Sequence, residues 1–538
     1  MRKSLIAQSV AAMIGGLGLA AAANAAIVAP APGTLVGLVP EAVQLVVNTD
    51  SIGHINLVPY FTTAGGNDTY VNITNTDTKN GKAVKVRFRG ASNSDDVYDI
   101  TVLMSPGDVW AAAITKDAAT GLPKLNHNDK TCTLPAGVKN VFVTTRLDST
   151  INAAAKAVQA SEGYVEILNM ADIPYNGAPG SLYQAIKHVN GVAPCTAAPL
   201  NALFTDSTDY ADAQSKGLEV PTTGLMTNWT IINVPKAASY TGGAVAVEAR
   251  TAGNLAGWGN IVLFPQAATP VLAANVNNYT SDPLLRGPAP IIAAAMFDFP
   301  DLSTPYTVNA VGALAPLAQA SALTGALAVT SSTNEFVTDP SILGKTNWVF
   351  SMPTRRYNVA FNYAGATDAA RRVFTDLSLA LPPYVNYFTA ANTSVSGRQL
   401  CVSGLTTVTP FDPATIAEPL NRTGGVTGNR EEGFAQSATE FVISPGEPAA
   451  PLTFCGEVSV LGVNGTNPLG AVVTIKDITG TAVDGWMRIA HPGLGATATT
   501  GAGLPIIGNM MTELFNGAAS AGVAGAYGQT FPHRHTRP

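Results

Sequence analysis

Charged residues are scarce in this chain. Asp, Glu, Lys and Arg make up 12% of the 538 residues, about half the usual share, whereas hydrophobic residues make up 46%. The formal net charge is −6, and it becomes −8 (−6 − 2) if Arg2 and Lys3 are removed with a leader. Such a chain lacks the positive surface that nucleic acids require, so nucleic-acid binding is not expected. Low charge also favours packing of identical copies, because little like-charge repulsion opposes it.

Long apolar runs are absent after the first 25 residues. A transmembrane helix needs about 20 consecutive apolar residues. The best candidate, Ile291 to Phe297, is far shorter and is bounded by Pro290 and Pro300. We therefore expect no transmembrane span.

Residues 1–25 have the pattern of a signal peptide. Arg2 and Lys3 give a cationic start, and residues 5–23 form an apolar run. The small residues Ala23 and Ala25 then suit a signal peptidase, which predicts cleavage after Ala25 and export of the chain.

The four cysteines lie far apart and form no CxxC pair, which argues against a zinc or redox site. An even number in an exported protein favours disulfides. Sequence order favours Cys132 with Cys195 and Cys401 with Cys455, although two other pairings remain open. Each loop of roughly 55 to 65 residues would give a stabilisation of about 4 kcal/mol in the chain-entropy model.

Familiar catalytic motifs are also missing. The sequence has no Gly-x-Ser-x-Gly, Ser-x-x-Lys or His-Glu-x-x-His pattern. The pair Asp298 and Asp301 is of a kind that arises by chance among 36 acidic residues. We therefore expect no enzymatic activity, with a secreted hydrolase of unrecognised site as one alternative.

One acidic segment is a candidate calcium site. Asp95, Asp96 and Asp99 lie at a loop-to-strand junction, and Asp108 lies in the following turn. Calcium prefers six to eight oxygen ligands, but this spacing lacks the Gly and terminal Glu of an EF-hand loop. The favoured interpretation is a turn in which Asp and Ser cap backbone NH groups. The segment Asp206 to Asp212 is a weaker candidate.

Alternating apolar and polar residues predict β-strands in the N-terminal half. The segments 70–74 and 84–89 alternate around Asn80-Gly81, a pair typical of hairpin turns. A strand over 97–104, a turn over 105–108 and a partner strand over 109–112 follow. These segments predict four consecutive antiparallel strands.

Further segments complete the prediction. Strands are expected at 141–143, 164–168, 229–234, 244–249, 261–264, 348–352, 357–361, 440–443, 458–461 and 472–475, and helices at 149–160, 181–189, 367–381 and 506–515. The stretches 268–345 and 402–436 are expected to be loops or insertions. The fold class is therefore mainly β, with antiparallel, immunoglobulin-like sandwich domains and a few helices in insertions. We divide the chain into the leader (1–25), an N-terminal β-rich domain (26–345) and a C-terminal one (346–538).

Two sequence blocks resemble a known group of proteins. The first runs from Val84 through Asp95-Asp96 to Trp110, and the second is Asn347 to Arg356. They are similar to exported surface-layer proteins of the nanopod type from Gram-negative β-proteobacteria. The resemblance implies a structural protein outside the cell that assembles with copies of itself into a lattice or sheath, with calcium as a candidate stabilising ion.

Several residues have competing interpretations. Arg355 and Arg356 could meet a carboxylate or a sugar phosphate such as that of lipopolysaccharide, but a solvated turn is the favoured interpretation. His533 and His535 could bind a transition metal, but a frayed terminus is favoured. A secreted adhesin, with Trp110 or Trp258 stacking on sugar, is the main alternative function.

Overall fold

The structure is a computed structural model. It describes residues 27–30, 39–265, 315–374, 384–407, 427–428, 452–478, 483–520 and 523–538, apart from single residues 138, 146, 206, 264, 364, 474, 492 and 498. The leader with Ala25, the pair Asp298 and Asp301, and the strand predicted at 440–443 lie outside these residues. Within them, no helix is long and apolar enough to cross a membrane.

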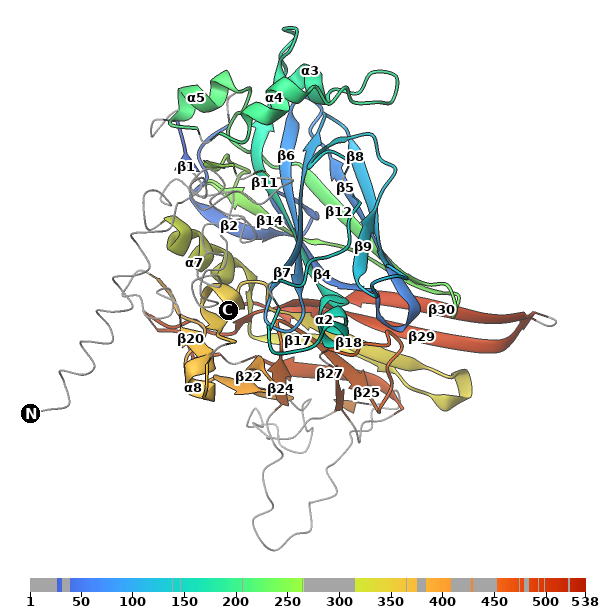
Figure 1. Cartoon of the computed structure of the whole chain (residues 1–538). Helices are drawn as coiled ribbons and strands as arrows, with labels where there is room; N and C mark the ends of the chain where they lie inside the picture. The colour runs from blue at the N-terminus through green and yellow to red at the C-terminus, as the bar shows by residue number, and fades with distance from the viewer. Residues whose placement is uncertain are drawn as a thin grey trace, which may run out of the picture.

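The N-terminal half is a sandwich of two antiparallel sheets (Figure 1). One sheet has the order β10 (Cys132–Leu134), β7 (Asp96–Met104), β6 (Gly81–Gly90), β11 (Glu162–Ile173), β4 (Ile55–Thr62), β14 (Val245–Arg250) and β2 (Gln44–Asn48). The other has the order β13 (Ala238–Gly243), β12 (Leu225–Asn233), β5 (Asn67–Asn75), β8 (Val109–Lys116) and β9 (Pro123–Asn126), with β3 (Ile52–Gly53) beside β12. Side chains such as Val86, Ile100, Ile73 and Trp229 fill the space between them.

The C-terminal half also contains two sheets. One has the order β21 (Thr393–Ser396), β22 (Gln399–Thr407), β27 (Asp484–Ala490), β17 (Ser331–Val337) and β31 (Arg534–Thr536), with β23 (Thr427–Gly428) on β27 and β24 (Leu452–Cys455) on β22. The other has the order β26 (Ile475–Ile478), β25 (Val458–Val463), β18 (Lys345–Ser351), β29 (Ile507–Ser520) and β30 (Val523–Pro532). The strands β25 and β26 are parallel, and the other pairs are antiparallel. Phe336, Trp348 and Phe454 lie in the core of this half.

Short elements connect these sheets. The helices are α2 (Ala153–Ala160), α3 (Leu182–Ile186), α4 (Ala197–Ala202), α5 (Tyr210–Ser215), α7 (Ala315–Leu327) and α8 (Asp368–Arg371), and the 3-10 turns are η1 (Ala64–Gly66), η6 (Pro340–Ile342) and η7 (Arg355–Tyr357). The two-stranded pairs are β1 (Ile27–Val28) with β15 (Ile261–Val262), β16 (Ala328–Val329) with β28 (Leu504–Pro505), and β19 (Val359–Phe361) with β20 (Arg372–Phe374).

The predicted fold class is confirmed: the protein is mainly β, with antiparallel sheets and few helices. The four consecutive strands are present as β5, β6, β7 and β8, but the expected hairpin partners are wrong. β5 pairs with β8 in one sheet, whereas β6 pairs with β7 in the other. The turns at Asn80-Gly81 and at 105–108 exist, but each carries the chain across the sandwich. Alternation of apolar and polar residues shows which face of a strand is buried, but it does not show which other strand pairs with it.

Two predicted helices are also wrong. The segment 506–515 belongs to β29, which is paired with β18 on one side and with β30 on the other. Its Met, Leu and Glu residues favour helix only weakly, and pairing on both edges outweighs that preference. The segment predicted at 367–381 holds only the short α8 before β20, and its residues 375–381 lie outside the described part. The stretch 268–345, expected to be loop, contains α7, β16 and β17.

The two halves pack directly on each other. Val349, Val460 and Met511 from the C-terminal sheets join the core of the N-terminal sandwich. Tyr357 and Ile507 join the second N-terminal core, around β2, β14 and α3. β17 precedes residue 346 and yet pairs with β27 and β31 of the C-terminal half. The exact domain boundary therefore stays a prediction.

Both favoured disulfides are confirmed. Cys132 on β10 is bonded to Cys195, which lies between α3 and α4. Cys401 on β22 is bonded to Cys455, its direct partner on β24. Each bond therefore ties a sheet strand to a segment more than 50 residues away in the sequence.

Candidate functional site

Strand β6 places three basic residues in the interior. Lys85, Arg87 and Arg89 share one face of the strand and are fully buried. Arg87 Nε lies 3.1 Å from Asp99 Oδ1 on β7, and Lys85 Nζ lies 3.5 Å from Asp99 Oδ2. Arg89 Nε lies 3.3 Å from Glu166 Oε2 on β11. Both faces of β6 are thus closed to solvent, one by the opposite sheet and the other by this charged layer.

The C-terminal half completes this layer through η7. Arg356 Nη2 donates to both oxygens of Glu166, at 3.2 and 3.3 Å. Arg355 Nη2 lies 2.8 Å from Glu457. The solvated turn favoured for Arg355 and Arg356 is therefore wrong, because both side chains are buried and meet carboxylates. The layer joins the two halves of the protein.

The basic side chains keep two buried carboxylates ionised. Burial alone would raise the pKa of Glu166, but Arg356, Arg89 and Arg87 outweigh burial and hold that pKa below its usual value. Burial likewise opposes ionisation of Asp99, and yet Lys85 and Arg87 lower its pKa to about 2. These are the properties of a structural ion-pair network.

The structure does not bring all four candidate calcium ligands together: Asp96 lies beside Asp99, but Asp108 lies beyond the other end of β7. Asp99 faces Lys85 and Arg87, and Asp95 accepts a hydrogen bond from Tyr363 Oη at 2.6 Å. Asp108 follows the far end of β7, about 25 Å along the strand from Asp96. Among the described residues, no group of three or more His, Cys, Asp or Glu side chains is placed to hold a metal. Calcium binding stays a prediction to which these contacts add nothing.

In the weaker acidic segment, Asp209 caps the N-terminus of α5 and its carboxylate accepts from the Asp212 backbone NH. Asp206 lies outside the described residues.

His535 lies in strand β31, and His533 directly precedes that strand. β31 pairs with β17, so the favoured interpretation of a frayed terminus is wrong. Ser332 Oγ lies 2.8 Å from His491 Nε2 and 2.9 Å from His535 Nδ1, and the ring of His533 stacks on Phe350. Burial lowers the pKa of His491 to about 3, and burial together with Arg537 lowers that of His535 to about 4.

The aromatic residues proposed for sugar stacking are buried. Trp110 and Trp258 are at most 1% exposed and lie in the N-terminal cores. The adhesin interpretation therefore loses the two side chains on which it was based.

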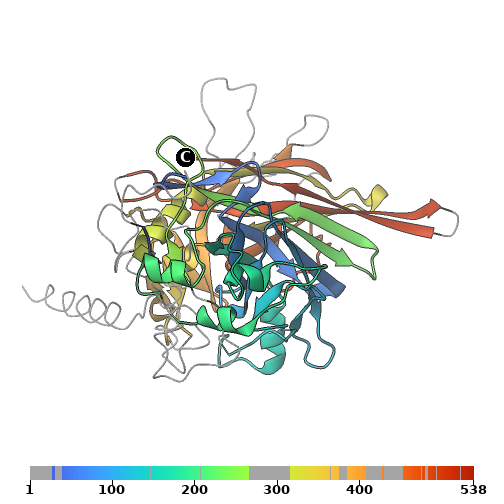
Figure 2. The same ribbon diagram turned by 90° about the horizontal axis from the view of Figure 1, so that it is seen from above.

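The most unusual surface feature is a projecting hairpin. Beyond Glu513, where β18 begins, β29 and β30 continue as a two-stranded ribbon that leaves the body of the protein (Figures 1 and 2). We call residues 514–531 the arm. No Asp, Glu, Lys or Arg occurs between Glu513 and Arg534 in the sequence. This run without charge was visible in the sequence, and it is the signal that our sequence analysis missed.

Two other hairpin turns lie beside the arm. β30 contacts β13, and η6 in the β17–β18 turn contacts β29. β30 and β13 approach so closely that a Cβ on Gly528 would lie 1.9 Å from the Ser239 carbonyl oxygen. Apolar side chains are exposed on all three hairpins: Val234 (73%), Ile342 (42%), Leu343 (48%), Tyr527 (56%) and Phe531 (40%).

Glu513 anchors the base of the arm. Its carboxylate lies 3.2 Å from Lys345 Nζ of β18 and 3.6 Å from Lys236 Nζ of the β12–β13 turn. Tyr240 Oη on β13 donates to the same carboxylate at 3.4 Å. Glu513 is the last charged residue before the arm, and it links the base of the arm to the β12–β13 and β17–β18 hairpins.

Comparison with protein-family models, with curated proteins and with solved structures gives no match to this chain.

Proposed function

We propose that this chain is an exported structural protein that assembles with copies of itself on the surface of a Gram-negative bacterium, as a surface layer or sheath. The arm is the observation that carries the proposal. A two-stranded ribbon alone is at best marginally stable in water. A ribbon that extends from the body without any charged residue therefore has the properties of an element that is covered by a partner.

The edges of the arm support self-association. Past Glu513, neither edge of the ribbon is paired with another described strand. Natural proteins usually protect such edges with Lys, Pro or a covering loop. The arm contains no Lys or Pro over residues 514–531. Open edges and exposed Tyr527 and Phe531 together suit strand addition and apolar contact with a second copy.

The rest of the chain fits a structural role outside the cell. The predicted leader would direct export, and the two disulfides are stable in an oxidising compartment. Lipopolysaccharide and calcium remain candidate partners of the assembly. Contact with lipopolysaccharide would use surfaces other than Arg355 and Arg356, because those side chains are buried.

The test introduces a charge into the arm. Tyr527→Glu places a carboxylate where the proposal expects an apolar contact, and self-association of the purified protein should weaken by about tenfold or more. Sedimentation velocity over a concentration series measures this change. Tyr175→Glu is the matched control, because Tyr175 is 72% exposed in the loop before α3, away from the three hairpins.

Equal self-association of Tyr527→Glu and the wild type would refute the role of the arm. A wild-type protein that stays monomeric at every concentration would refute the function itself.

A further inference from the structure

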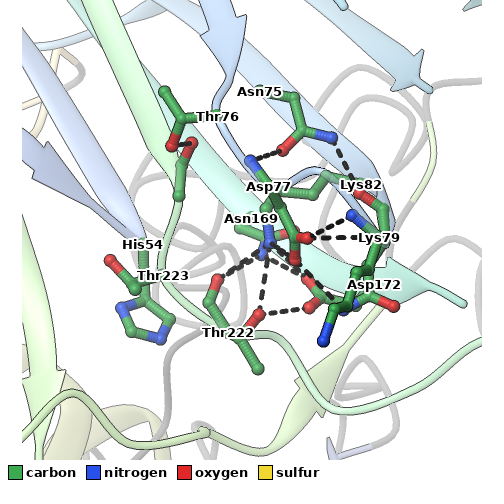
Figure 3. A network of polar contacts seen from close by, with 12 residues as sticks. His54, Asn75, Thr76, Asp77, Lys79, Lys82, Asn169, Asp172, Thr222 and Thr223 are labelled. Atoms are coloured by element: carbon green, nitrogen blue, oxygen red, sulfur yellow. Dashed lines mark hydrogen bonds and ion pairs between the residues drawn. The ribbon is translucent and has the colours of Figure 1, made fainter. Parts of the chain in front are cut away.

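A second polar network lies inside the N-terminal sandwich, and it includes a buried lysine (Figure 3). Lys82 on β6 and Asn169 on β11 are fully buried, and Asp172 on β11 is 1% exposed. Lys82 Nζ lies 2.8 Å from Asp172 Oδ1, and Asn169 Nδ2 donates to the same oxygen at 2.9 Å. Both nitrogens also donate to the carbonyl oxygen of Thr222, at 3.1 and 3.0 Å. Because they share two acceptors, Lys82 Nζ and the amide of Asn169 are neighbours.

A bulge in β11 produces this arrangement. Asn169 pairs with Val84 and Asp172 pairs with Lys82, but the register shifts between Asn169 and Ala171. Residues three apart on a regular strand point to opposite faces, whereas one extra residue in a bulge brings them to the same face. The bulge therefore directs the amide and the carboxylate of one strand toward the lysine of its neighbour.

Burial favours the neutral form of Asp172. Burial raises the pKa of Asp172 above its usual value, although Lys82, Thr222 and Asn169 oppose that shift. The hydroxyl of Thr222 donates to the other oxygen of Asp172 and fixes the carboxyl group. Asn169 Oδ1 is buried and has no hydrogen-bond partner among the described atoms. A buried carbonyl oxygen without a hydrogen bond destabilises the network in its present form.

We propose that Lys82 and Asn169 form an intramolecular amide bond that joins β6 to β11, with Asp172 as the group that transfers the proton. Asp172 accepts a proton from Lys82 Nζ, and the free amine attacks Cγ of Asn169. One Nζ–Cγ bond forms, the Cγ–Nδ2 bond breaks, and the nitrogen leaves as ammonia after proton transfer through Asp172. The reaction needs no oxidant, reductant or cofactor.

Proximity would accelerate this reaction. Groups held together in the correct orientation react as if at very high concentration, on the order of 10⁵ M or more in favourable cases. The burial of Lys82, Asn169 and Asp172 also limits the access of bulk water, which would compete with the amine as a nucleophile. The product would cross-link two neighbouring strands in the middle of the seven-stranded sheet, which suits a protein under mechanical load at a surface.

The intact mass of the purified, reduced and denatured protein tests the proposal. The cross-link removes about 17 Da, the mass of one ammonia molecule, from the mass calculated for the chain. Trypsin should then release residues 80–85 joined to residues 157–187, because no Lys or Arg occurs inside the second segment. Fragmentation of this joined peptide should place the bond at Lys82 and Asn169.

Two variants and one control complete the test. Asn169→Ala and Asp172→Ala should each restore the full mass, whereas Lys79→Arg, at an exposed lysine of the preceding loop, should keep the loss. A wild-type protein of full mass would overturn the proposal whether or not the variants fold. A loss of about 18 Da, with the bond between Lys82 and Asp172, would overturn the assignment of Asn169 as the partner and of Asp172 as the proton carrier. None of these results depends on self-assembly.

Discussion

Glu166 connects the two halves of the protein, and Glu166→Gln should destabilise it strongly. The carboxylate lies 3.2 Å from Arg356, 3.3 Å from Arg89 and 4.0 Å from Arg87. Gln has nearly the same shape, so the change creates no cavity. It removes the negative charge that faces Arg89 and Arg356, while Arg87 keeps its contact with Asp99. Removing one partner of a buried pair costs about 3–5 kcal/mol, and we expect a loss of that size.

Urea denaturation with both disulfides intact measures this loss. Tryptophan fluorescence reports on the cores of both halves, because Trp229 is buried in the core of the N-terminal sandwich and Trp348 in the core of the C-terminal half. The double variant Glu166→Gln/Arg356→Met should recover part of the lost stability, since it removes one cation together with the anion. Asp368→Asn is the control, because the pair of Asp368 with Arg371 is exposed and should contribute at most about 1 kcal/mol. A cost below about 1 kcal/mol for Glu166→Gln would refute the importance of the charged layer.

Two further predictions concern pH and disulfides. Burial lowers the pKa values of His54 and His491 to about 3, so both are neutral in the folded protein above that pH. In the unfolded chain they take up protons below pH 6.5. The stability of the fold should therefore decrease as the pH falls from 6.5 towards 3. Each histidine should lower the free energy of unfolding by about 2 kcal/mol as the pH falls from 6.5 to 5. In urea denaturation, the stability of His491→Asn should therefore depend less steeply on pH than that of the wild type in this window. An unchanged slope would contradict the assignment of His491. Cys132→Ser/Cys195→Ser should lower the free energy of unfolding by about 4 kcal/mol, because the bond closes a loop of 63 residues. Calorimetry measures this loss. A loss below about 1 kcal/mol would show that the bond does not constrain the unfolded chain.

The sequence contained enough information for the fold class, several strands and both disulfides. The alternation over 84–89 predicted a strand correctly, but it did not show that Arg87 and Arg89 are buried. Their burial depends on Glu166 and Arg356, which lie 77 and 267 residues from Arg89 (166 − 89 and 356 − 89). Local patterns cannot reveal such distant partners, and Arg355 and Arg356 were assigned to a solvated turn for the same reason.

The arm and the lysine network were missed for different reasons. Residues 514–531 are rich in Ala and Gly, which have low strand preference, and the two strands form because β29 and β30 pair with each other over a long stretch. The group of Lys82, Asn169 and Asp172 depends on a bulge, and a one-residue shift in register leaves no mark in the sequence. The charge-free run at 514–533 was the one readable sign of the arm.

Electron microscopy of the purified mature protein shows directly whether the arm drives assembly. We expect regular two-dimensional sheets or tubes that form on concentration in the wild type and in Tyr175→Glu, and that are lost in Tyr527→Glu. Wild-type particles that stay separate and monomeric under all conditions, or arrays that are unchanged in Tyr527→Glu, would contradict assembly through the arm.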